Sequence, residues 1–122
     1  MFRPTDAWKI EAHLLLRRLE PSITSIMAYW KIPQMKVVIG GTPDIASLPN
    51  AQPPVLVLGK KWVEAGSDQE RLKRVVHEVA GHMAYHLELG DEAREQGYFS
   101  DPERDTKSWE WFQEWRRGGK YE

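Results

Sequence analysis

The sequence predicts a single α+β domain in which two N-terminal helices precede a small sheet, a histidine-bearing helix and a closing aromatic helix. Three observations predict this class. Apolar residues recur at helical spacing in four stretches. Two short apolar runs, residues 35–39 and 55–58, are bounded by Gly and Pro, as strands are. The length of 122 residues fits one domain.

The amino-acid composition limits the classes of function that the protein is expected to have. Hydrophobic residues at 41% and charged residues at 29% are typical of a globular protein. The net charge of -1 gives no general attraction to nucleic acid. The absence of Cys leaves His and carboxylates as zinc ligands and fits a reducing compartment. No leader is visible and no apolar run approaches the roughly 18 residues of a membrane span, so we expect a cytoplasmic protein that does not enter a membrane. Oligomeric state is not indicated.

The N-terminal third predicts two scaffold helices. Thr5 and Asp6 are candidate caps for a helix that ends at Pro21. A second helix is expected over residues 22–31. His13 is expected to be a structural or surface histidine.

The middle of the chain predicts a small sheet. Residues 35–39 form a strand that runs into the Gly40-Gly41 turn, and a proline-rich loop follows to residue 54. Residues 55–58 form a second strand beside the first.

The next helix, expected from Ser67 to about Leu89, carries the chemistry. Ser67 and Glu70 form a capping box at its start. Zinc binds neutral imidazole nitrogens, and a carboxylate beside a zinc-activated water is suited to take its proton. We therefore predict that His77 and His82 are metal ligands and that Glu78 is the general base.

The spacing of these residues departs from an α-helix. Five residues separate His77 and His82, which would point about 140° apart on an ideal helix. A one-residue π-bulge closes this gap, because residues i and i+5 stack on a π-turn, and Gly81 is where the backbone yields most easily. Without a metal, Glu78, His82 and His86 would instead form a polar stripe on a straight helix.

A catalytic zinc needs a third protein ligand, which we expect from the downstream chain. On a helix over residues 102–117, Asp105 falls on the same face as four aromatic residues, whereas Glu103 falls on the opposite face. A carboxylate on a core-facing surface is costly unless a metal compensates. We predict Asp105 as this ligand, ahead of Glu103; the remaining candidates are His86, Glu92 and Glu95.

Two resemblances support this interpretation. The string His77-Glu78-Val79-Ala80-Gly81-His82 resembles the H-E-x-x-G-H signature of the dipeptidyl peptidase III zinc peptidases. Residues 55–115 resemble SprT-like (Spartan) zinc peptidase domains in their order of strand, Trp62, capped His-Glu helix and aromatic helix; Asp105 stands where those domains place a third histidine. The resemblance implies one zincin-like metallopeptidase domain over residues 1–122.

The expected function is zinc-dependent hydrolysis of peptide bonds in a peptide or protein substrate. Tyr85, Arg94 and Tyr98 are candidate oxyanion stabilisers. If the strand at residues 55–58 is an edge strand above the zinc helix, an extended substrate could bind by adding to the sheet there. The alternative is that this strand belongs to a structural hairpin or meander with no role in binding.

Two alternatives belong to other classes. The first is a zinc-binding module without catalysis. The second is a metal-free protein-interaction module that uses the Trp-rich last helix, which an exposed Trp109 or Trp111 would favour.

Overall fold

The chain folds as a mixed α+β structure. A computed structural model describes residues 7–32, 34–48, 51–84 and 102–118, with residues 84 and 102–106 described by their backbone alone. This part contains four α-helices, one π-helix and a three-stranded sheet. None of its helices combines the length and apolar character needed to cross a membrane. In chain order the elements are α1 (Ala7–Tyr29), β1 (Lys36–Ile39), β2 (Ile45–Leu48), β3 (Val55–Leu58), α2 (Lys60–Val63), α3 (Asp68–Val76), the π-helix η2 (His77–Ala84) and α6 (Pro102–Arg117).

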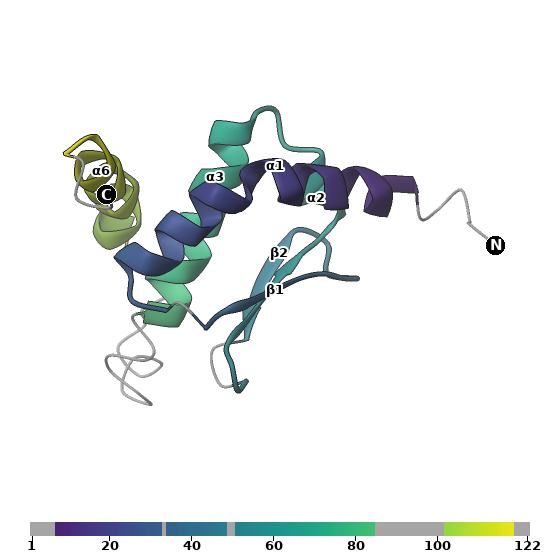
Figure 1. The fold of residues 1–122 in the computed structure, drawn as a ribbon, viewed down its shortest axis with the longest axis horizontal. Helices are drawn as coiled ribbons and strands as arrows, with labels where there is room; N and C mark the ends of the chain where they lie inside the picture. Colours follow the sequence, from purple (N-terminus) through teal and green to yellow (C-terminus); the bar gives the residue numbers. More distant parts are fainter. Residues whose placement is uncertain (1–6, 33, 49–50, 85–101, 119–122) are drawn as a thin grey trace.

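The N-terminal scaffold is one helix, so the prediction of two helices divided at Pro21 is wrong. Helix α1 runs through Pro21 without interruption and crosses above the sheet in the view of Figure 1. A mid-helix proline costs about 3 kcal/mol. Leu15, Leu19, Ile23 and Ile26 form one buried stripe on both sides of it. Burial of each such side chain contributes roughly 1.5–3 kcal/mol, which outweighs the cost of the proline.

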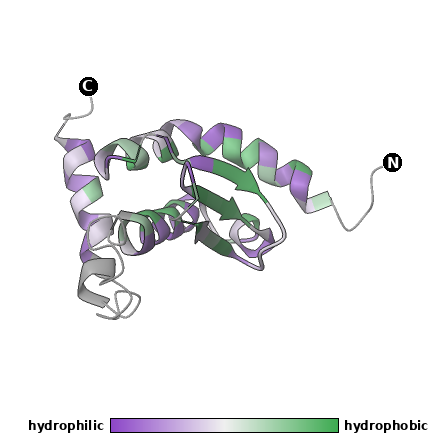
Figure 2. Cartoon of the chain, turned by 90° about the horizontal axis from the view of Figure 1, so that it is seen from below, coloured by the Kyte–Doolittle hydropathy of each residue, from purple (hydrophilic) through white to green (hydrophobic). Residues whose placement is uncertain are grey.

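The two predicted strands pair as neighbours. β1 and β3 are parallel, with Lys36 opposite Val55 and Ile39 opposite Leu58. In β3 the side chains of Leu56 and Leu58 are fully buried, while Val55 and Val57, which alternate with them, face the more open side. Figure 2 shows the strands coloured as hydrophobic along most of their length. The sheet therefore presents one covered face to the helices.

A third strand lies within the segment predicted to be a loop. β2 pairs antiparallel with β3, and Ile45 stands opposite Leu58, so the strand order is β1-β3-β2. The prolines around this segment indicated a loop, but only four residues are needed to pair with β3. This corrects the expectation that residues 55–58 might form an edge: β3 is central, and β2 is the edge strand that packs against η2.

The start of α3 is fixed by its neighbours in the chain. The Ser67 hydroxyl accepts a hydrogen bond from the Glu70 amide at 3.2 Å, which confirms the Ser67 half of the predicted capping box. The Arg71 guanidinium donates to the backbone carbonyls of Val63 at 2.7 Å and Ala65 at 2.9 Å. Since these carbonyls lie at the end of α2 and just after it, Arg71 ties α2 to α3 and fixes the direction in which α3 leaves.

Helix α6 closes the fold with aromatic side chains, as predicted. Phe112 is fully buried and its ring lies within 6.2 Å, centroid to centroid, of Trp30, Trp109 and Trp115. Trp111 departs from the pattern, because it is 40% exposed on the outer side of the helix. α6 packs against α1, α3 and η2, and therefore against the helix that carries the histidines.

Candidate metal centre

The histidines lie on a π-helix. α3 is α-helical to Val76, and the backbone then continues as a π-helix over the eight residues His77–Ala84. The sequence predicted a single π-bulge; the structure has the predicted kind of turn over a longer segment. A Cβ added at Gly81 would lie 4.0 Å from the His77 ring, which is ordinary contact. Gly81 thus contributes backbone freedom to the π-helix, and no close packing requires it.

The π-turn brings the two predicted ligands together. The Nε2 atoms of His77 and His82 are 3.2 Å apart, and the ring planes meet at 85°. Two imidazole nitrogens bound to one tetrahedral zinc at 2.0–2.1 Å would be separated by about 3.3 Å. The observed spacing therefore matches two ligands of a single ion. It also matches a hydrogen bond between a donor and an acceptor imidazole.

Glu78 completes the cluster. Its carboxylate oxygen Oε2 lies 3.8 Å from His82 Nε2, and the residue is only 8% exposed. One ligand atom from each of His77, Glu78 and His82 falls within a mutual distance of 4.8 Å. This group could hold a metal ion, with nitrogen and oxygen donors that suit several divalent metals.

The surroundings of Glu78 favour its protonated form. Burial raises the pKa of the Glu78 carboxyl, and nearby Asp44 raises it further. A hydrogen bond from the Ser47 hydroxyl and the charge of His77 act in the opposite direction, without cancelling the effect of burial. A carboxylate with a raised pKa is a stronger base near neutral pH, which suits the predicted role of Glu78.

The predicted third ligand falls where the structure describes the backbone only. Positions 103 and 105 belong to α6, and position 105 precedes the buried Ser108 by about one helical turn. The side chains of Glu103 and Asp105 lie outside the description, so neither is placed at or away from the cluster. The other candidates also lie outside the described residues: His86, Glu92 and Glu95 as ligands, and Tyr85, Arg94 and Tyr98 as oxyanion stabilisers. His13 is exposed on α1, in agreement with its predicted role as a surface histidine.

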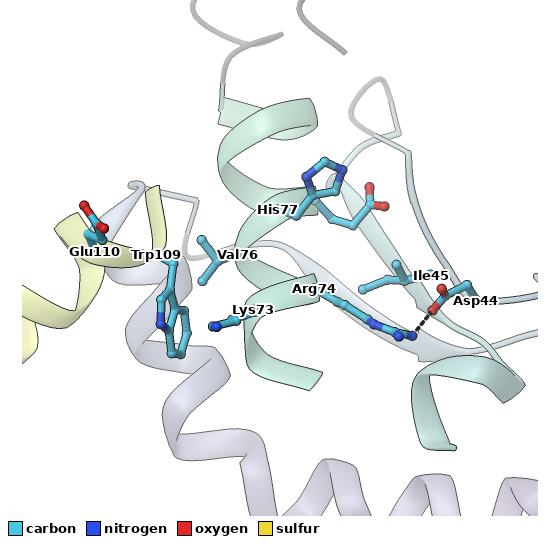
Figure 3. Close-up of a pocket in the computed structure, with 9 residues that line it drawn as sticks. Asp44, Ile45, Lys73, Arg74, Val76, His77, Trp109 and Glu110 are labelled. Carbon is cyan, nitrogen blue, oxygen red and sulfur yellow. Dashed lines mark hydrogen bonds and ion pairs between the residues drawn. The ribbon is translucent and has the colours of Figure 1, made fainter. Parts of the chain in front are cut away.

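A cleft of about 690 Å³ opens beside His77 and Glu78. Its walls come from the start of β2, from α3 and η2, and from α6, and Figure 3 shows α6 and the sheet on either side of the histidine helix. Asp44 accepts a hydrogen bond from Arg74 at 2.9 Å on one wall. Lys73 lies over the Trp109 ring at 5.9 Å on the other.

Sequence reasoning did not find these cleft residues. Asp44 and Ser47 belong to the segment predicted to be a loop, and Lys73 was not among the predicted site residues. The signal for β2 was too weak to predict a strand, because Ile45 is its only β-branched residue and prolines flank the segment on both sides.

Comparison of the chain with models of protein families, with curated proteins and with solved structures gives no match. The function is therefore inferred from the side chains of the site.

Proposed function

We propose that this chain is a zinc-dependent peptidase whose metal is held by His77 and His82. The observation that carries the proposal is the 3.2 Å separation of the two Nε2 atoms, since it agrees with tetrahedral zinc ligation and arises on an unusual π-helix. Such π-segments are frequent at functional sites, which supports a functional role for this histidine pair.

Each residue of the cluster has a role in this proposal. A bound zinc ion would supply a Lewis acid that polarises the substrate carbonyl and acidifies water. His77 and His82 offer neutral imidazole nitrogens to the ion, and Asp105 is proposed as the third ligand. Glu78 takes a proton from the attacking water and passes it to the leaving amine. Its burial supports this assignment, because a water-poor site strengthens a general base.

The edge strand β2 is the proposed guide for substrate. It packs against η2, and in the described part of the chain only its β3 side is paired. An extended peptide that hydrogen-bonds to the other side would run beside His77 and Glu78. The substrate in this proposal is an unfolded or flexible protein segment, and charge offers no support for a nucleic-acid partner.

One observation favours a second candidate. Trp111 is 40% exposed on α6, and an exposed Trp is a common anchor of protein interfaces. A protein-interaction module, with or without a bound but non-catalytic zinc ion, would use this surface. Trp109 is half-buried against Phe112 and supports the alternative less.

The test is cleavage of an unfolded protein such as reduced, alkylated lactalbumin by the zinc-loaded chain. We expect fragments that disappear with chelator, return with added zinc and are absent with Glu78→Gln. Trp111→Ala should leave cleavage unchanged. Loaded protein that cleaves neither this substrate nor a mixed peptide library would reject the peptidase and favour the interaction module.

A further inference from the structure

We propose that the cleft beside the cluster recognises a carboxylate on the peptide, through Lys73 set against Trp109. This inference rests on the proposed function and names the class of substrate that the site would select. It assigns a specificity role to two residues outside the ligand and base set.

The geometry points an ammonium group into the cleft. Lys73 stands on α3 one turn before His77, about 6 Å along the helix axis. Its Nζ lies 5.9 Å from the centroid of the Trp109 ring, and both residues line the cleft of about 690 Å³. Figure 3 shows Lys73 and Trp109 turned toward each other, with His77 farther along the same helix. The contact with the ring restrains a side chain that is otherwise flexible.

The charges around the cleft leave this ammonium available. Arg74 and Asp44 form an ion pair at 2.9 Å and compensate each other. Glu78 is buried beside the histidines, and the Glu110 carboxylate points away from Lys73 in Figure 3. Within the described residues, no carboxylate lies within 4.0 Å of Lys73 Nζ. The two other cations of α3 differ in this respect, because Arg71 and Arg74 each form an ion pair with an aspartate. A ligand with a negative charge would therefore complete the site.

The distance between Lys73 and His77 along the helix indicates which position of a bound peptide would carry the charge. About 6 Å along the helix axis corresponds to roughly two residues of extended chain. A peptide with its reacting carbonyl at the cluster would bring a carboxylate one or two residues away to Lys73. That group is either an acidic side chain or the carboxylate at the end of the chain, and both present the same chemistry.

Peptide binding can be measured without hydrolysis, so it tests the carboxylate site separately from the peptidase activity. We would load the full chain with zinc in the Glu78→Gln background and measure anisotropy with three sets of dye-labelled eight-residue peptides. The first carries one Glu, moved through each position, and a C-terminal amide. The second carries Gln at the same position and the amide. The third carries Gln and a free C-terminal carboxylate.

We expect the first or the third set to bind about tenfold more tightly than the second, as a charge-assisted hydrogen bond in a partly desolvated site allows. The first set identifies an acidic side chain, and the third identifies the chain end. Lys73→Gln should abolish the difference, Lys73→Arg should retain most of it, and Lys36→Gln on the opposite edge strand should leave it unchanged. Circular dichroism would verify that each variant folds.

The outcomes separate the two proposals. Equal binding of all three sets, or no binding, overturns the carboxylate site, even when the wild-type chain cleaves peptides and the peptidase stands. A preference that depends on Lys73, in a wild-type chain that cleaves nothing, supports the carboxylate site and rejects the peptidase.

Discussion

The Nε2 atoms of His77 and His82 lie 3.2 Å apart across one turn of a π-helix, with their ring planes at 85°. This arrangement places two imidazole donors at the separation of ligands on one tetrahedral ion. The buried carboxylate of Glu78 lies 3.8 Å from His82, so a base and a ligand share the same turn.

Glu78→Gln should separate metal binding from catalysis. If Glu78 is the general base, the variant keeps its zinc and loses about 10²- to 10⁴-fold in peptide hydrolysis. Metal content and the initial rate of cleavage are measured on the same preparation. A variant that loses its zinc together with its activity would show that Glu78 is a ligand, and the role of base would then be rejected.

The stability of the metal-free protein should depend on Glu78 and pH. Because burial raises the pKa of Glu78 in the folded state, folding is favoured at low pH, and this contribution is lost as pH rises through the folded pKa. Metal-free Glu78→Gln should therefore be more stable than wild type at pH 7, and the difference should narrow toward pH 4.5. Thermal unfolding in chelator measures it, with Glu11→Gln on the exposed side of α1 as control. A wild type more stable than the variant at pH 7 would contradict the assignment.

Gly59→Ala should weaken the wall of the cleft. A Cβ at Gly59 would overlap the Thr42 carbonyl oxygen and come within 2.6 Å of the Asp44 carbonyl oxygen, which accepts the Gly59 amide. We expect a loss of at least about 1–3 kcal/mol in the free energy of unfolding. Denaturant titration measures this loss. Gly66→Ala, where no heavy atom lies within 4 Å of the new Cβ, should change stability far less. Equal losses in the two variants would reject the steric explanation.

Asp105→Ala and Glu103→Ala should differ in zinc affinity. Position 105 precedes the buried Ser108 by about one turn of α6, whereas periodicity sets Glu103 on the outer side. Loss of a true ligand should exceed the roughly 10- to 100-fold that removal of a supporting hydrogen bond costs. Competition with a fluorescent zinc chelator measures both affinities. A larger loss in Glu103→Ala would exchange the two roles.

Local signals in the sequence accounted for much of the fold. The Ser67 cap is a hydrogen bond between residues only three positions apart, so the local sequence is enough to predict it. Five-residue spacing between His77 and His82 is likewise local, and it predicted the π-turn because no α-helix would let both rings reach one ion. The short apolar run over residues 55–58, ended by Gly59, predicted their strand, and the structure confirms it.

Contacts between distant residues account for what the sequence did not predict. Helix α1 continues past Pro21 because its apolar stripe is buried by elements that follow it in the chain. β2 exists because β3 supplies its hydrogen bonds, and its own residues have weak strand preference. The Arg74–Asp44 pair spans thirty residues, and the Lys73–Trp109 contact spans thirty-six, so no local pattern identifies the cleft.

The most direct test of the metal centre is the zinc content of the purified protein, measured by mass spectrometry in native and acid-denatured form. The account predicts about one zinc per chain, lost in His82→Ala and retained in His13→Ala, which changes an exposed histidine on α1. A wild-type chain that takes up no zinc even after incubation with the ion would contradict it. Zinc that persists in His82→Ala would also contradict it, because the ion would then be held elsewhere.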